Sequence, residues 1–170
     1  MSNIELSSVD WKVVDRLRKI LEQSQGHEYN GTLAYGLCVA ILAWVMQRIC
    51  IDKSNSPKDE AAIAVKKELE KRKRIEEFLG IGIEEGKNRF SGFTSVFDFL
   101  KKFRNACAHG DGRTIVPENK GEFLIGFTID FNQHNQNKTS RKYILLKERE
   151  LRNIGIAVAR LYCEKLSAAE

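Results

Sequence analysis

The stretch GTLAYGLCVAILAWVM, residues 31–46, carries no charged side chain and is apolar almost all round. A helix of this composition has to be covered, either by neighbouring elements or by lipid. A membrane-spanning helix takes about 20 apolar residues, and this run is shorter and has no basic residue immediately before it. We therefore expect residues 32–51 to form the central helix of a bundle, with a small membrane-associated helical protein as a further hypothesis.

Helical patterns continue on both sides of this segment. Apolar residues at helical spacing predict a helix over 9–25, and Pro57 suits the first turn of a helix over 57–79. The charge-rich run 66–77 pairs Glu with Arg at i,i+4, which is more typical of a solvated helix face than of a nucleic-acid-binding stripe. The glycines of GIGIEEG, residues 80–86, predict a helix C-cap and turn rather than a phosphate-binding loop.

The second half of the chain changes its hydrophobic period twice. A helix is predicted to begin near Ser91 or Thr94 and to end at His109, on an aromatic-rich stripe formed by Phe93, Val96, Phe97, Leu100, Phe103 and Cys107. Alternating residues then predict strands over 123–131 and 141–146, and the helical period returns over 147–166. The predicted fold is mainly α: a single domain over 1–170, a bundle of about five helices with a β-hairpin insertion, at about 121–146, before the last helix.

Composition limits the class of protein further. A chain of 170 residues suits one compact domain, and 28 Lys and Arg against 23 Asp and Glu permit a nucleic-acid partner without requiring one. The cysteines form no CxxC pair, so we expect neither a zinc site nor a cofactor. The first residues resemble no secretory signal, and we expect a cytoplasmic protein with the reduced thiols Cys38, Cys50, Cys107 and Cys163.

The residues best suited to acid–base chemistry gather at the end of the 94–109 helix. There FRNACAHGDG places His109 five residues after Arg104, with Asn105 next to the arginine. Arg104 follows the core residue Phe103, so it should lie at the edge of the buried face. Arg104 and His109 either form a site or cap the last carbonyls of the helix. Because Cys107 falls on the core stripe, the series Cys107, His109 and Asp111 is not expected to bind a metal.

At these residues the sequence resembles the HEPN superfamily, the small helical-bundle domains of prokaryotic defence and toxin–antitoxin systems and of some eukaryotic RNases. The hallmark of that superfamily is Arg-x4–6-His near the end of a core helix, often with a polar residue directly after the Arg. Arg104, Asn105 and His109 match it in order and spacing. The resemblance extends over most of the chain. It is closest to a branch borne on plasmids and mobile elements, in which a hairpin-like insertion precedes the last helix.

This resemblance implies a metal-independent RNA endonuclease that acts as a homodimer, a toxin or defence effector restrained by a cognate antitoxin protein or by conditional activation. Attack by the RNA 2′-OH, which gives a 2′,3′-cyclic phosphate, needs a base, an acid and a cation for the developing phosphorane charge. One chain offers a single well-placed histidine, and a two-fold interface would supply the second.

The expected catalytic residues are therefore Arg104, Asn105 and His109. Lys101, Lys102 and Arg113 flank them and either bind RNA phosphates or are ordinary solvated side chains. The rival hypothesis is a non-catalytic HEPN-fold module, for interaction or nucleic-acid binding, in which Arg104 and His109 only cap the helix. No membrane partner is expected under either hypothesis.

Overall fold

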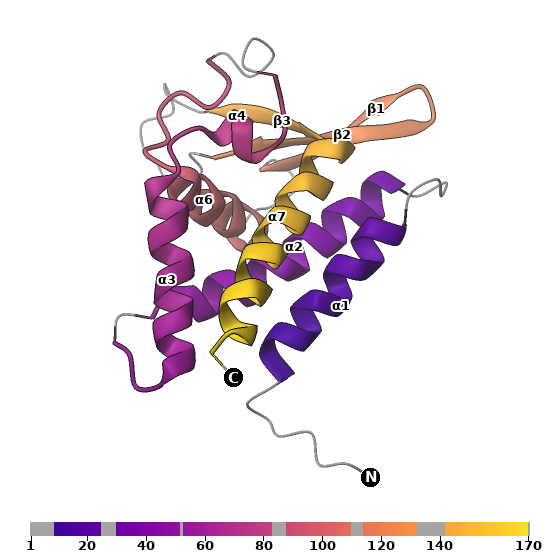
Figure 1. The fold of residues 1–170 in the computed structure, drawn as a ribbon. Coiled ribbons are helices and arrows are strands. Elements are labelled where there is room, and N and C mark those ends of the chain that lie inside the picture. The colour runs from indigo at the N-terminus through magenta and orange to yellow at the C-terminus, as the bar shows by residue number, and fades with distance from the viewer. Residues whose placement is uncertain are drawn as a thin grey trace.

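The computed structural model of the chain describes residues 9–24, 30–51, 53–82, 88–109, 114–131 and 142–169. Its helices form a bundle, and a small sheet lies across one end of it (Figure 1). In chain order the elements are α1 (Val9–Gln23), α2 (Asn30–Ile49), α3 (Pro57–Lys71), α4 (Ile75–Phe78), α6 (Val96–His109), β1 (Ile115–Lys120), β2 (Phe123–Asp130), β3 (Tyr143–Lys147) and α7 (Glu148–Ser167). The predicted fold class, mainly helical with a small β insertion before the last helix, is confirmed.

The charge-free helix α2 lies at the centre of the bundle. It contacts α1, α3, α6, α7 and β2, and its buried residues include Cys38, Ile41, Val45 and Ile49. By length and composition α2 could also cross a membrane, and 39% of its most apolar 18-residue window is buried inside the molecule. The side of α2 that faces these elements is therefore a core face, as the sequence predicts.

Helix α7 packs closely against both α1 and α2. A Cβ atom added at Gly155 would lie 2.6 Å from Cδ2 of Leu21 and 3.4 Å from Cα of Cys38, so only glycine fits this crossing without a shift. The buried Arg152 donates hydrogen bonds to the Leu21 carbonyl and, at 3.0 Å, to Ser24 Oγ at the end of α1. These contacts satisfy polar groups that a helix terminus would otherwise leave unpaired.

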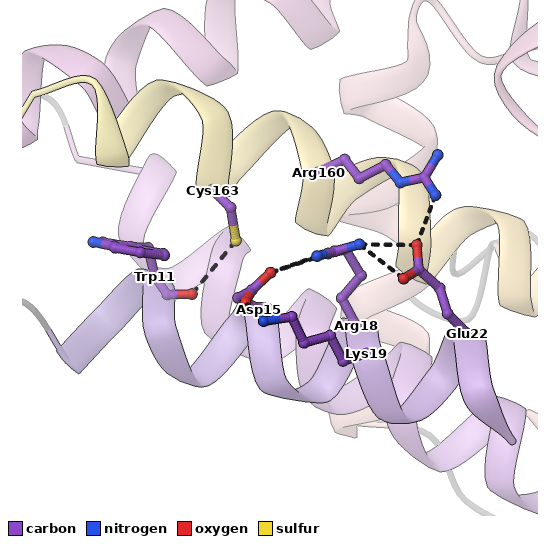
Figure 2. A network of polar contacts seen from close by, with 7 residues as sticks. All are labelled: Trp11, Asp15, Arg18, Lys19, Glu22, Arg160 and Cys163. Carbon is purple, nitrogen blue, oxygen red and sulfur yellow. Dashed lines mark hydrogen bonds and ion pairs between the residues drawn. The ribbon is translucent and has the colours of Figure 1, made fainter.

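An ion-pair network runs along the outer side of the same contact (Figure 2). Arg18 bridges Asp15 and Glu22 at 2.6 and 2.8 Å, and Glu22 also accepts a hydrogen bond from Arg160 of α7 at 2.7 Å. Side chains at this surface are partly exposed, and such pairs contribute on the order of 0.2–1 kcal/mol each. The network therefore aligns α1 with α7, and the buried apolar contacts hold them together.

The third helix is shorter than predicted, because α3 ends at Lys71 and a separate turn, α4, begins at Ile75. Arg72 has an extended backbone, and its carbonyl accepts the Val96 N–H at 2.8 Å. The buried positions of α3 are Ala62, Val65 and Leu69, so a continuous helix would turn charged residues toward the core next. The break instead exposes residues 72–74 and buries Ile75 and Leu79.

Gly80 follows α4 with φ +64°, in the left-handed region that favours glycine, which confirms the predicted C-cap. Residues 83–87 of the predicted turn lie outside the described residues.

The sheet has three antiparallel strands in the order β1-β2-β3, one more than the predicted hairpin. β1, with the sequence IVPENK, was not predicted because it contains Pro117 and its residues do not alternate between apolar and polar. The strands therefore begin at Ile115 rather than near residue 121, and Gly121, with φ +64°, forms the turn into β2. The predicted turn after β2 falls in residues 132–141, which lie outside the described residues.

The pairing of β2 with β1 shifts in register at Ile125, which is left without a partner between the pairs Gly126–Glu118 and Leu124–Asn119, and the alternation of β2 only partly predicts burial. Phe127 and Ile129 are buried beneath the sheet, whereas Phe123 is 73% exposed. Leu124 lies instead against Gly31 at the start of α2. A bulge adds one residue to one strand and so changes which side chains face the helices.

Candidate functional site

The helix that carries the motif, α6, is fixed at its start and along its apolar side. The Asp98 N–H donates to Ser95 Oγ at 3.2 Å, which caps the helix, and the Thr94 N–H donates to Asp98 Oδ2 at 3.1 Å. Phe99 stacks on Phe131 at 5.5 Å between ring centroids and meets Phe93 edge-to-face at 5.3 Å. α6 thus ends at His109, as predicted, on a rigid aromatic support.

The predicted core stripe of α6 is confirmed, with Phe93 and Cys107 at its half-buried margins and with Phe99 and Ala106 as further buried members. Cys107 points toward α2, where its thiol interacts with the Tyr35 side chain. Burial raises the pKa of the Cys107 thiol to about 11. The Tyr35 ring stacks on Phe127 of β2 at 4.3 Å. One small cluster thus joins the end of α6 to α2 and to the sheet.

This orientation of Cys107 separates it from any metal site around His109. In the described parts of the chain, no three His, Cys, Asp or Glu side chains are grouped as a metal ion would require. Asp111, the third member of the possible trio, lies outside the described residues.

Two of the three motif residues are in direct contact. Arg104 Nη1 donates to Asn105 Oδ1 at 3.2 Å, and both side chains are half-buried, so Arg104 lies at the edge of the core as predicted. His109 is exposed at the last residue of the helix. With 3.6 residues per turn, Asn105 and His109 share one stripe, whereas Arg104 and His109 point about 140° apart. Within one chain, Arg104 and His109 therefore flank Asn105 on either side.

The predicted RNA-binding lysines both lie next to Asn105 on the surface of α6. Lys101 is exposed between Arg104 and Asn105, and Lys102 is half-buried on the stripe of Asn105 and His109. Lys102 Nζ forms an ion pair with Asp98 at 3.0 Å and lies 5.2 Å from the centroid of the Phe93 ring. Arg113 lies outside the described residues.

A further lysine, Lys142, lies beside this stripe and was not predicted from the sequence. Lys142 precedes β3, and its Nζ lies 4.9 Å from the centroid of the same Phe93 ring. Burial, followed by the charge of Lys102, lowers the pKa of Lys142. No local motif marks Lys142, because only the packing of the sheet on α6 brings it to Phe93.

A helical bundle with Arg-x4-His at the end of a core helix, followed by a small sheet and a closing helix, defines a HEPN-type domain. A family model described as HEPN pEK499 p136 matches residues 1–168, and the chain belongs to this family. The predicted resemblance to the HEPN superfamily is thereby confirmed. Neither a curated protein nor a solved structure matches the chain significantly.

Proposed function

We propose that this HEPN protein is a metal-independent RNA endonuclease that acts as a homodimer. The observation that carries the proposal is the arrangement at the end of α6, where Arg104 contacts Asn105 and His109 is exposed on the stripe of Asn105. A guanidinium can stabilise the developing phosphorane charge, and an accessible imidazole can act as the base or the acid that phosphodiester cleavage without a metal requires. Family membership supports the HEPN-type fold that presents them.

In the proposed reaction, His109 of one subunit takes the proton of the RNA 2′-OH. The 2′-oxygen then bonds to phosphorus, and the bond from phosphorus to the 5′-oxygen breaks. The partner subunit's His109 gives its proton to the leaving 5′-oxygen. Arg104 stabilises the charge on the phosphorane oxygens, and Asn105 hydrogen-bonds the scissile phosphate or orients the imidazole. The products are a 2′,3′-cyclic phosphate and a 5′-OH.

The outer face of α2 supports a homodimer. Its exposed positions are small or apolar for the most part: Thr32, Gly36, Ala40, Ala43, Trp44 and Gln47. Trp44 is 39% exposed, and no side chain fills the space beside Gly36. Uncovered apolar faces mark interaction sites.

We propose further that Lys101 and Lys102 bind neighbouring phosphates and that the protein acts in the cytoplasm as a toxin or defence effector. An enzyme that cuts cellular RNA harms its host, so a cognate antitoxin protein or a conditional trigger would restrain it. This step rests on analogy with the superfamily.

Cleavage of total RNA in EDTA tests the proposal. The wild type should release fragments that end in a cyclic phosphate, and His109→Ala should reduce the rate by about 10²–10⁴-fold, the usual contribution of general acid–base catalysis. Arg104→Ala should lose activity as well. Arg74→Ala, which removes an exposed arginine at the start of α4, is the matched control and should cleave normally.

Two outcomes would reject the proposed activity. If a folded wild-type dimer cleaves no RNA, the non-catalytic HEPN-fold module becomes the better hypothesis. If His109→Ala cleaves as fast as the wild type, the activity belongs to another site or another protein.

A further inference from the structure

Two ammonium groups from distant parts of the chain meet at one aromatic ring. Lys102 comes from α6 and Lys142 from the segment before β3, and their Nζ atoms lie 5.2 and 4.9 Å from the centroid of the Phe93 ring. The ring itself is held by edge-to-face contacts with Phe99 and Phe131, each at 5.3 Å between centroids. Lys142 Nζ also lies 3.5 Å from Ser91 Oγ, at the limit of a hydrogen bond. Both cations are thus placed by contacts with fixed partners.

Among the residues that the structure describes, one carboxylate is paired with these two charges. Asp98 pairs with Lys102 at 3.0 Å and also accepts the Thr94 N–H, so its charge is shared with the helix cap. Within the part of the chain that the structure describes, Lys142 forms no ion pair. Burial and the neighbouring charge of Lys102 both oppose the charged form of Lys142 and lower its pKa. A pair of like charges held together in this way is stabilised when an anion binds between them.

We propose that Lys102, Lys142 and Phe93 form a subsite for a backbone phosphate of the RNA strand that enters the candidate site. The inference rests on the proposed function and adds to it one element outside the motif, Lys142, together with the ring that positions it.

The position of this subsite relative to the motif favours a nucleic-acid strand over a free anion. Lys102, Asn105 and His109 lie at i, i+3 and i+7 on one stripe of α6. At 1.5 Å per residue, Lys102 is about 10 Å from His109 along the helix. A stacked strand advances about 3.4 Å per nucleotide, so a strand that follows the stripe would bring the phosphate about three nucleotides from the cut bond to Lys102 and Lys142.

Binding measurements in the cleavage-deficient His109→Ala chain test the subsite independently of catalysis. Fluorescence anisotropy with a labelled single-stranded RNA, recorded over a range of salt concentrations, gives both the Kd and its salt dependence. Adding Lys142→Gln should weaken binding about 5–10-fold and reduce the slope of log K against log salt by about 0.7, the value for one phosphate contact on a single strand. Lys142→Arg should preserve both values, because it keeps the charge.

Lys67→Gln, which removes an exposed lysine of α3, is the matched control and should leave binding unchanged. If Lys142→Gln also leaves the Kd and the slope unchanged in a folded protein, the subsite is rejected while RNA cleavage by the wild type still stands. If the wild type does not cleave but binding depends on Lys142, the catalytic proposal fails and the phosphate subsite stands. If His109→Ala binds no RNA at low salt, the subsite is rejected.

Discussion

Arg104 and His109 belong to one motif, yet their side chains leave α6 in directions about 140° apart. In the proposed dimer, groups from both subunits would approach one scissile phosphate from different directions, which is a reason for a second copy beyond the count of acids and bases. The sequence predicted the half-buried position of Arg104 from its neighbour Phe103, and that position is confirmed. Lys142 could not be predicted, because it lies 49 positions after Phe93 in the chain and only the packed sheet brings them together.

The cysteines Cys50 and Cys107 should differ in their rates of alkylation. At pH 8, iodoacetamide should modify the exposed Cys50 well before Cys107, because only the thiolate reacts and burial raises the pKa of Cys107 to about 11. Mass spectrometry of quenched time points measures both rates in one sample. Equal rates for Cys50 and Cys107 would show that Cys107 does not face α2.

The same shift makes stability depend on pH in the alkaline range. The pKa of Cys107 in the folded state lies above its ordinary value of 9.0, so its contribution to stability is complete below about pH 9 and is lost as the pH rises through about 11. Burial also raises the pKa of Cys163 to about 11, which adds to the loss in the same range. Urea midpoints at pH 8 and pH 11 measure this change, and an unchanged midpoint would contradict it.

Among the elements, those with a strong apolar period were predicted and those that depend on tertiary contacts were not. α1, α2, α6 and α7 were found close to their observed ends. The break between α3 and α4 was missed because charged residues 72–74 have good helix propensity, and only the need to bury Ile75 and Leu79 interrupts them. β1 was missed because an edge strand with little buried surface has no apolar period to reveal it.

Two helical glycines should respond in opposite ways to substitution by alanine. Gly155→Ala should destabilise the protein by about 1–3 kcal/mol, because the added Cβ collides with Leu21 where α7 crosses α1 and α2. Gly36→Ala should stabilise it by about 0.5–1 kcal/mol, because Gly36 lies in α2 with open space beside it and alanine is the better helix former. Urea unfolding of both variants gives the two free energies, and a destabilised Gly36→Ala or a neutral Gly155→Ala would contradict this packing.

At the scale of the whole molecule, the proposed homodimer needs a surface that can meet a second copy. The edges of the sheet are poor candidates. β1 carries Pro117 and charged residues, both of which discourage further strand pairing. On the other edge, Arg89 Nη2 donates to the Leu145 carbonyl at 2.6 Å while it pairs with the buried Glu150. The outer face of α2 has no such protection, so we place the proposed dimer contact there.

Ala40→Glu tests this assignment. A carboxylate on the outer face of α2 should convert the dimer to a monomer, because an unpaired charge inside an apolar interface is strongly unfavourable. Light scattering after size-exclusion chromatography measures the mass, and cleavage should fall together with the dimer. Ala64→Glu, which changes an exposed alanine of α3, is the control and should leave the mass unchanged. If the Ala40→Glu variant is still a dimer, the subunits meet at another face and this assignment is wrong.

The sharpest measurement mixes wild-type and His109→Ala chains, allows the subunits to exchange, and follows RNA cleavage as the wild-type fraction changes. If each cleft needs the imidazoles of both subunits, activity follows the square of that fraction, and an equal mixture retains about a quarter of the wild-type rate. A linear dependence, with about half of the rate at equal mixing, would mean that each His109 acts independently of the partner's His109 and would contradict a shared two-histidine cleft.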